Sequence, residues 1–206
     1  MGTRARRERE KENMRTAILG AATKIIIEDG YDSLSMRKIA DAIDYTPTTL
    51  YNYYKDKAQI LDDISRQVYE KIVSDVKHAF EENSDKPLDD QLSIGLKTFL
   101  NCAANNAETG RALMRSGMKA IFGPGETSDH PEDNGILILQ NLLARGQQES
   151  VFRKLDSNMP WMLVTALIGF VLYVVENQLY ADPTWGEMVN TYIEMLVSGL
   201  LIRKGQ

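Results

Sequence analysis

The chain has 206 residues, 43% of them hydrophobic, and a formal net charge of −5 at pH 7. An apolar fraction of this size is enough for an ordinary buried core and indicates a globular chain of one or two domains. The single cysteine, Cys102, excludes an intramolecular disulfide, and no leader resembling a signal peptide opens the chain. These features predict a cytoplasmic protein.

The charge is unevenly distributed along the chain. Residues 1–57 hold 11 Lys/Arg and 9 Asp/Glu, a net of +2, whereas the remaining residues hold 13 and 20, a net of −7. An acidic remainder opposes non-specific wrapping of nucleic acid and favours binding through the N-terminal end alone.

The first fifteen residues carry the densest basic charge. Arginines and lysine between Arg4 and Arg15 alternate with Glu8, Glu10 and Glu12. This pattern is equally compatible with a solvated helix or frayed tail and with an arm that contacts DNA.

The remaining sequence indicates an all-α protein, because long intervals between its few Pro and Gly breaks carry helical periodicity with little strict alternation. A first amphipathic helix should end at Gly30. Its apolar seam recurs at intervals of three and four residues: Met14, Ala17, Ile18, Ala21, Ala22, Ile25 and Ile26. This helix should pack over the segment that follows and hold it rigid.

Residues 34–61 contain two short helix signatures separated by a turn. Ser35 can cap a helix over residues 36–44, whose apolar stripe is Met36, Ile39, Ala40 and Ile43. Asp44 should close this helix, since a short polar residue can adopt the left-handed conformation, although Gly would do so with less strain. The turn should begin at Tyr45.

A second helix is predicted over residues 47–54. Thr46 supplies a capping hydroxyl, and Pro47 suits the first helical position because its fixed φ is helical and its missing N–H would be unpaired there. Asp56 and Gln59 then form the pattern of a capping box, which predicts a third and longer helix over residues 56–82.

The segment Leu50, Tyr51, Tyr53, Tyr54 and Lys57 follows a threonine-capped helix start. With that start it resembles the N-terminal domain of the tetracycline-repressor (TetR) family of bacterial transcription regulators, over about residues 15–64. One departure is Asp44, where the family usually has Gly.

The resemblance implies a three-helix DNA-binding head with a helix-turn-helix, residues 1–57, joined to a larger helical body for ligand binding and dimerisation, residues 58–206. The second helix of the pair should enter the major groove with its N-terminal residues facing base edges. By position in the motif, the base-facing residues are Pro47, Thr48 and Tyr51, and the phosphate-holding residues are Thr46, Thr49, Tyr53 and Lys57. Arg37 matches a family position that can reach guanine, Ser35 completes the candidate DNA-binding set, and Leu50 and Tyr54 are expected in the core.

The body should contain helices over residues 88–105, 107–122, 136–148 and 159–180 and a last helix that begins at Trp185. Residues 123–133 have the composition of a loop. Asp129, His130, Glu132 and Asp133 in this loop suggest a metal site, yet their spacing does not match a typical ligand set. We therefore predict no metal and no cofactor.

Residues 161–175 are apolar nearly all round, which suits a helix buried on two sides. The stretch is shorter than the roughly 20 residues of a membrane span and is closed by Glu176 and Asn177. With the apolar seam of the last helix, it predicts a homodimer built on a four-helix bundle across a two-fold axis, as in the family resembled. The candidate interface residues are Trp161, Leu172, Tyr192, Leu196 and Leu200.

The function predicted is a repressor that a small hydrophobic or aromatic effector releases from a near-palindromic operator. Large apolar and soft side chains of the body are the candidate pocket residues: Phe99, Met114, Met118, Phe122, Trp161, Phe170 and Tyr173. Two alternatives remain open, a constitutive or architectural DNA-binding protein without an effector and a helical adaptor or enzyme. No catalytic constellation supports an enzyme, because neither His78 nor His130 lies beside a candidate nucleophile.

Overall fold

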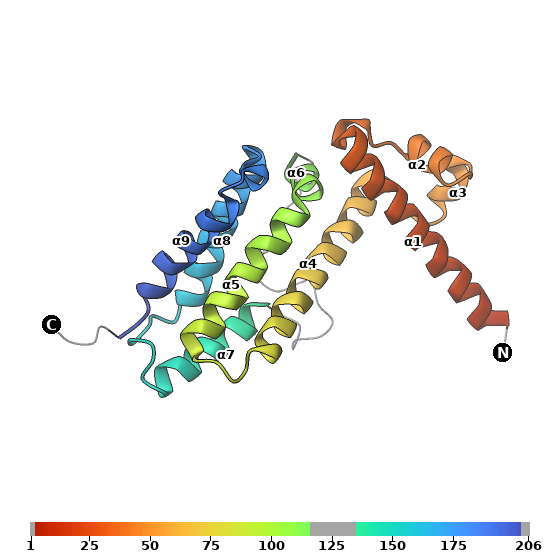
Figure 1. Cartoon of the computed structure of the whole chain (residues 1–206). Helices are drawn as coiled ribbons and strands as arrows, with labels where there is room; N and C mark the ends of the chain where they lie inside the picture. The colour runs from red at the N-terminus through yellow and green to blue at the C-terminus, as the bar shows by residue number, and fades with distance from the viewer. Residues whose placement is uncertain (1–2, 116–134, 203–206) are drawn as a thin grey trace. The chain divides into compact units, whose positions relative to one another are not determined.

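The computed structural model describes residues 3–115 and 135–202, and its regular structure is helical, as the sequence predicts (Figure 1). An isolated antiparallel bridge between Phe152 and Leu201 is the one extended pairing in these residues. The helices in chain order are α1 Thr3–Asp29, η1 Tyr31–Ser33, α2 Met36–Ala42, α3 Pro47–Tyr51, α4 Lys57–Glu82, α5 Leu88–Asn105, α6 Ala107–Arg115, α7 Gly135–Gln148, α8 Met159–Glu176, η3 Leu179–Ala181 and α9 Trp185–Ser198.

The described residues form two compact units. Unit 1 comprises residues 3–68 with residues 108–115, and unit 2 comprises residues 69–107 with residues 135–202. The division falls within α4, whereas the boundary predicted from the sequence lies at the start of that helix.

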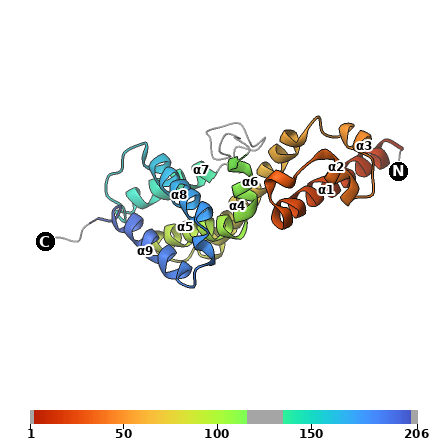
Figure 2. The same ribbon diagram turned by 90° about the horizontal axis from the view of Figure 1, so that it is seen from above.

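Unit 1 is built on one apolar face of α1, against which α2, α3 and the first turns of α4 pack (Figure 2). Its fully buried side chains include Ile18, Ala22, Ile39, Leu50 and Ile60. The seam predicted for the first helix is confirmed in part: Ile25 and Ile26 are also buried and Met14 and Ala21 are half-buried, but Ala17 is exposed and Leu19 is buried in its place. Ala112 of α6 belongs to the same core.

Three helix boundaries differ from the prediction by three or more residues. α1 begins at Thr3 and not near Met14, so the basic N-terminal segment continues the helix and is not a frayed tail. α3 ends at Tyr51, because the Asn52 and Tyr53 N–H groups bond three residues back and tighten the last turn. α8 ends at Glu176, followed by Gln178 at a φ of 55°.

Unit 2 has a second core to which α5, α7, α8 and α9 contribute. The seam predicted for the last helix is inward-facing, since Val189, Ile193 and Val197 of α9 are buried. The opposite face of α9 is mostly polar. The exposed residues of α9 are Gly186, Glu187, Asn190, Thr191, Glu194, Met195 and Ser198.

Aromatic side chains join α8 to α9 at one end of unit 2. Phe170 stacks on Tyr192 with ring centroids 4.2 Å apart and lies 6.0 Å from the ring of Trp185. The Tyr192 hydroxyl donates to the carbonyl oxygen of Ala166 at 2.7 Å, and the Trp185 indole N–H donates to Asn101 of α5 at 3.2 Å. Both polar tips are thus hydrogen-bonded, as is usual for amphipathic aromatic residues.

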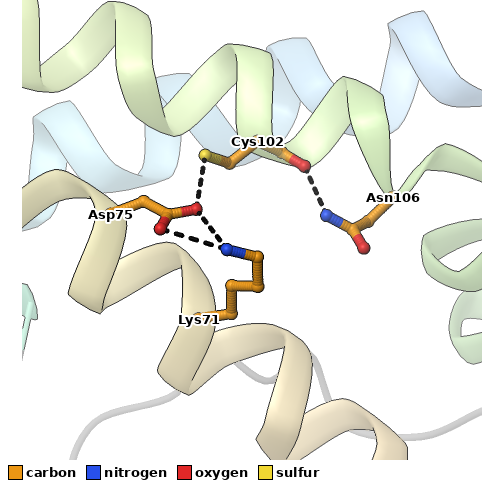
Figure 3. Close-up of polar contacts among 4 residues, drawn as sticks. All are labelled: Lys71, Asp75, Cys102 and Asn106. Atoms are coloured by element: carbon orange, nitrogen blue, oxygen red, sulfur yellow. Dashed lines mark hydrogen bonds and ion pairs between the residues drawn. The ribbon is translucent and has the colours of Figure 1, made fainter.

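The cysteine takes part in a polar contact between α4 and α5 (Figure 3). Its Sγ–H donates to Asp75 Oδ2 over 3.5 Å, and Lys71 Nζ contacts both oxygens of the same carboxylate, at 3.0 and 3.2 Å. Burial, and then the Asp75 carboxylate, raise the pKa of the Cys102 thiol to about 11, so the thiol is protonated at neutral pH. The Lys71 ammonium holds the pKa of Asp75 below its ordinary value.

One described helix, α8, is long and apolar enough by length and composition to cross a membrane. Only 28% of its 18-residue span is buried inside the chain. Met162, Thr165, Gly169, Leu172 and Tyr173 share the exposed face, at helical spacing. This mostly apolar face distinguishes α8 from an ordinary core helix.

Candidate nucleic-acid interface

The turn between α2 and α3 begins with a helix C-cap centred on Asp44. Asp44 has a φ of 58°, the left-handed conformation predicted for it. The Tyr45 N–H donates to the Ala40 carbonyl at 3.0 Å and the Asp44 N–H to the Asp41 carbonyl at 3.4 Å. These two bonds are those of a Schellman motif, which satisfies the free carbonyls at the end of α2. The motif redirects the chain so that α3 can start only a few residues later.

The start of α3 is capped as the sequence predicts. Thr46 Oγ1 accepts from the Thr49 N–H at 3.2 Å and lies 3.0 Å from the Thr49 hydroxyl, and Pro47 occupies the first helical position. A five-residue helix has little intrinsic stability, so this cap and the core contact of Leu50 hold it in place. Ser35 caps α2 similarly, accepting from the Lys38 N–H at 3.2 Å.

The end of the α3 segment is anchored through Tyr54, which is 1% exposed. Its hydroxyl donates to Asp63 Oδ2 of α4 at 2.9 Å, and the Arg15 guanidinium of α1 lies 5.5 Å from its ring centroid. Burial, and then the bond to Asp63, raise the pKa of Tyr54 above its usual range. The core roles expected for Leu50 and Tyr54 are confirmed, and α3 is held from behind by α1 and α4.

The start of α4 carries the predicted capping box in a slightly shifted form. Asp56 Oδ1 accepts from the Gln59 N–H at 3.0 Å, while Gln59 Oε1 accepts from the Lys55 N–H at 2.8 Å. Lys57 directly follows Asp56 in the chain. Its ammonium lies 3.5 Å from the Leu34 carbonyl oxygen and 4.7 Å from the ring centroid of Tyr31.

The candidate DNA-binding residues differ in the solvent exposure of their side chains. Arg37 is the most open, with its side chain 86% exposed, and Tyr51 is 56% exposed although it is a large aromatic residue. Ser35, Thr46 and Thr48 are also exposed. The half-buried members are Pro47, Thr49, Tyr53 and Lys57.

The sequence did not predict how the pair is tied to α1. Lys38 Nζ bonds Asp29 Oδ2 at 2.7 Å, and Arg15 lies between Tyr54 and Asp63. Helical spacing could not reveal these pairings, because their members are remote in the chain and meet only when the helices cross.

The candidate body residues fall into different environments. Trp161 and Phe99 are half-buried, as is Phe170, whereas Tyr173 is 64% exposed and faces away from the core. Met118 and Phe122 lie outside the described residues, as does the acidic loop around His130. For Met114 the backbone alone is described, within α6.

The candidate interface residues also differ in how far their side chains are exposed. Leu172 is 41% exposed, and Trp161, Tyr192 and Leu196 are half-buried. Leu200 is 3% exposed within the core of its own unit, so its side chain offers no free surface to a partner.

Comparisons with known proteins agree with this geometry. The family model of bacterial regulatory proteins of the tetR family matches residues 18–64, which include α2, the turn, α3 and the start of α4. No curated protein sequence matches the chain.

Solved structures of the same fold cover nearly the whole chain. A TetR family transcription regulator from Marinobacter aquaeolei VT8 is 22% identical, with a TM-score of 0.66 over 97% of this chain and 100% of that one. The fatty acid degradation regulator FadR from Bacillus halodurans is 18% identical, with a TM-score of 0.67 over 89% and 94%. A tetR-family regulatory protein from Rhodococcus RHA1 is 16% identical, with a TM-score of 0.64 over 92% and 98%.

The matched family is one of bacterial regulatory proteins and not of enzymes. In a helix-turn-helix the second helix enters the major groove, and in this chain that helix is capped by Thr46, held by the buried Tyr54 and exposed at Tyr51. The chain is a DNA-binding transcriptional regulator of the TetR family.

Proposed function

We propose that the chain is a cytoplasmic homodimeric repressor that leaves a near-palindromic operator when a small hydrophobic or aromatic effector binds its body. Residues 1–57 form its DNA-binding head and residues 58–206 its effector-binding and dimerisation body. The observation that carries the proposal is the exposed outer face of α3, where Tyr51 stays 56% exposed while Leu50 beside it is fully buried. An exposed aromatic residue on a helix held this rigidly is suited to recognition and has no packing role.

Two roles are assigned to the candidate DNA-binding residues. Pro47, Thr48 and Tyr51 face base edges, and Arg37 forms a bidentate contact with guanine, worth about 1–3 kcal/mol of discrimination. The residues that hold phosphates and so set register are Thr46, Thr49, Tyr53 and Lys57, and Ser35 completes the DNA-binding set. The exposure of Arg37 and Tyr51 supports the first role, and the position of Lys57 at the start of α4 supports the second.

The proposed dimer interface is centred on the exposed face of α8. Met162 and Tyr173 are 59% and 64% exposed, and Met195 of α9 adds another exposed side chain at 60%. Leaving such side chains in water forgoes about 25 cal/mol for each Å² of apolar surface that a partner would bury. Gly169 lies between them with nothing within 4 Å of where its Cβ would be, so a second helix can approach closely. Trp161, Leu172, Tyr192 and Leu196 flank or support this face.

Light scattering after gel filtration tests the dimer. The wild-type chain should elute with twice its mass of 23.2 kDa at micromolar concentration. Tyr173→Asp should give a monomer, because a charge on the α8 face would be buried without a partner. Ile27→Asp, at a 56% exposed apolar residue of α1, is the matched control and should remain a dimer. A wild-type monomer would refute the interface.

The effector proposal rests on the aromatic character of unit 2, where Phe170 stacks with Tyr192 and Trp185 and where Phe99 and Trp161 are half-buried. Ligand pockets are lined mostly by such side chains. The fold shared with a fatty acid degradation regulator adds fatty acids to the compounds to be tried. A binding compound should raise the melting temperature and lower operator affinity, since an effector shifts the equilibrium by its differential affinity for the two states.

Selection of bound duplexes from a random library by the full chain is the decisive experiment. An inverted repeat with half-sites about 34 Å or a multiple apart is expected from two symmetry-related heads. Half-sites without inverted symmetry would contradict the dimeric arrangement. A clear operator whose affinity no apolar compound changes would favour a constitutive DNA-binding protein.

A further inference from the structure

The ammonium group of Lys57 is held by two neutral groups of the segment between α1 and α2. It lies 4.7 Å from the ring centroid of Tyr31 and 3.5 Å from the carbonyl oxygen of Leu34. The distance to the carbonyl oxygen is longer than that of an ordinary hydrogen bond, whereas the distance to the ring is well inside the roughly 6 Å range of a cation–π contact. The ring of Tyr31 is therefore the main partner of this lysine.

Tyr31 is placed by a short segment that its own hydrogen bonds fix. Gly30 has a φ of 80°, a conformation that turns the chain out of α1 and that glycine adopts without strain. The Leu34 N–H then donates to the Tyr31 carbonyl oxygen at 3.0 Å. The Ser33 hydroxyl donates to the Asp29 carbonyl oxygen at 2.9 Å. Because the side chain of Tyr31 also packs against the core of unit 1, its ring is a fixed surface for the lysine.

Neutral partners orient the Lys57 ammonium without cancelling its charge. Within residues 3–115 and 135–202 the structure records no carboxylate partner for Lys57. Lys38 of the same unit differs, because its ammonium pairs with Asp29 Oδ2 at 2.7 Å. An ammonium has three N–H donors, and one ring face with one carbonyl oxygen does not occupy them all. Lys57 therefore keeps its full charge and a donor for an anion.

We propose that Tyr31 is a positioning residue of the DNA interface, whose ring holds the Lys57 ammonium where it meets a phosphate of the operator. The inference rests on the phosphate contact proposed for Lys57 and adds the group that prepares it. An unheld lysine loses rotamer freedom when a phosphate immobilises it, and this loss weakens binding. Stacking the ammonium on a ring before DNA arrives removes part of that loss. The ring also keeps water from one side of the ammonium, which strengthens its attraction to the phosphate.

Two substitutions at Tyr31 separate its ring from its bulk. Tyr31→Leu removes the ring but keeps an apolar side chain against the core, and it leaves the net charge of the chain unchanged. Long-range attraction to DNA is therefore the same as in wild type. Tyr31→Phe keeps the ring face and loses only a hydroxyl, for which the structure records no hydrogen bond among the described residues.

A double-mutant cycle on operator affinity is the test. The full chain, Tyr31→Leu, Lys57→Gln and the doubly substituted variant are titrated with the selected duplex at physiological salt. In the wild-type background Tyr31→Leu should weaken binding about two- to fivefold per head, the effect of losing one partly exposed cation–π contact. In the Lys57→Gln background it should weaken binding by less than about twofold, because the ammonium that it positions is absent. Tyr31→Phe should bind like wild type.

Two further measurements separate positioning from folding. Urea unfolding followed by circular dichroism shows whether each variant is fully folded where affinity is measured. NMR of selectively labelled lysine side chains in the free full chain reports the stacking directly. The ε-methylene protons of Lys57 should resonate at high field over the ring, and this shift should be lost in Tyr31→Leu and kept in Tyr31→Phe. A Lys57 without the shift would overturn the contact.

The outcomes distinguish this inference from the proposed function. An equal loss of affinity from Tyr31→Leu in both backgrounds would make Tyr31 a structural residue only, and a gain in affinity would mean that the ring withholds the ammonium from DNA. Either result, or no change, would overturn the positioning role while leaving Lys57 as a phosphate contact. Lys57→Gln binding like wild type would overturn that contact and this inference with it. A wild-type chain that enriches no duplex would overturn the proposed operator binding itself.

Discussion

The Tyr54 hydroxyl donates to Asp63 Oδ2 at 2.9 Å, joining the residue that closes the α3 segment to the second turn of α4. Asn52 lies two residues before Tyr54 in the same tyrosine-rich segment. Tyr51, directly before Asn52, is 56% exposed. Neighbouring tyrosines in one motif therefore have opposite roles, one structural and one available to DNA.

Tyr54→Phe should lower the free energy of unfolding by about 1 kcal/mol, the net worth of one hydrogen bond, because Asp63 keeps its contacts with Arg15 and Arg66. Tyr54→Ala should cost about 3–5 kcal/mol by opening a cavity. Tyr51→Phe is the matched control and should leave stability unchanged while altering operator affinity. Urea unfolding followed by circular dichroism measures both. Equal stability losses at the two tyrosines would contradict the assignment.

Asp44→Gly should stabilise unit 1 by up to about 1 kcal/mol, since Gly adopts the left-handed conformation without the contact between Cβ and the carbonyl oxygen. Asp44→Val should destabilise it by about 1–2 kcal/mol, because a β-branched residue adopts this conformation with greater strain. Chemical denaturation of the three chains tests the order Gly, Asp, Val. Any other order would mean that the cap is not what limits stability here.

Arg37 and Lys57 should give different DNA-binding phenotypes. Arg37→Ala should relax preference at one base pair by about 1–3 kcal/mol, and its stability should hardly change because the ion pair with Asp41 is exposed and 4.0 Å long. Lys57→Gln should weaken binding to all sequences and lower the salt slope by about 0.9 per head.

Competition with single-base operator variants and salt titrations separate the two effects. Lys57→Gln also removes the contact with the Tyr31 ring, worth about 0.5–1 kcal/mol, so its unfolding must be measured alongside. Lys24→Gln, on the far side of α1, is the charge control and should bind like wild type. An unchanged base preference in Arg37→Ala would remove its base-reading role.

Cys102 should react slowly with iodoacetamide at pH 8, and its rate should rise as pH approaches the thiol pKa of about 11. Asp75→Asn should shift this rise to lower pH, because it removes the carboxylate that adds to the effect of burial. Cys102→Ser is the blank. Because the folded-state pKa lies above the unfolded value of 9.0, the thiol's contribution to stability is complete below pH 9 and is lost as pH rises toward 11. A rate at pH 8 equal to that of an exposed thiol would contradict the contact.

Local signals predicted the helix-turn-helix closely. Ser35, Asp44, Thr46 with Pro47, and Asp56 each act within a few residues of the chain, so their capping roles can be read from spacing and are present in the structure. Helix ends were less predictable where no cap residue marks them. The run of charged helix formers before Met14 has no apolar periodicity, yet α1 extends through it to Thr3.

The sequence by itself therefore determined the helical class, the capped pair and the tyrosines that belong to it, because capping and helical periodicity depend on residues close together in the chain. Only the tertiary structure decided which side of each helix is covered. It buried the apolar seam of α9 and Leu200 within their own unit and left the apolar face of α8 exposed. The reason is that periodicity marks a face of a helix, whereas the partner of that face is set by how helices remote in sequence cross and pack.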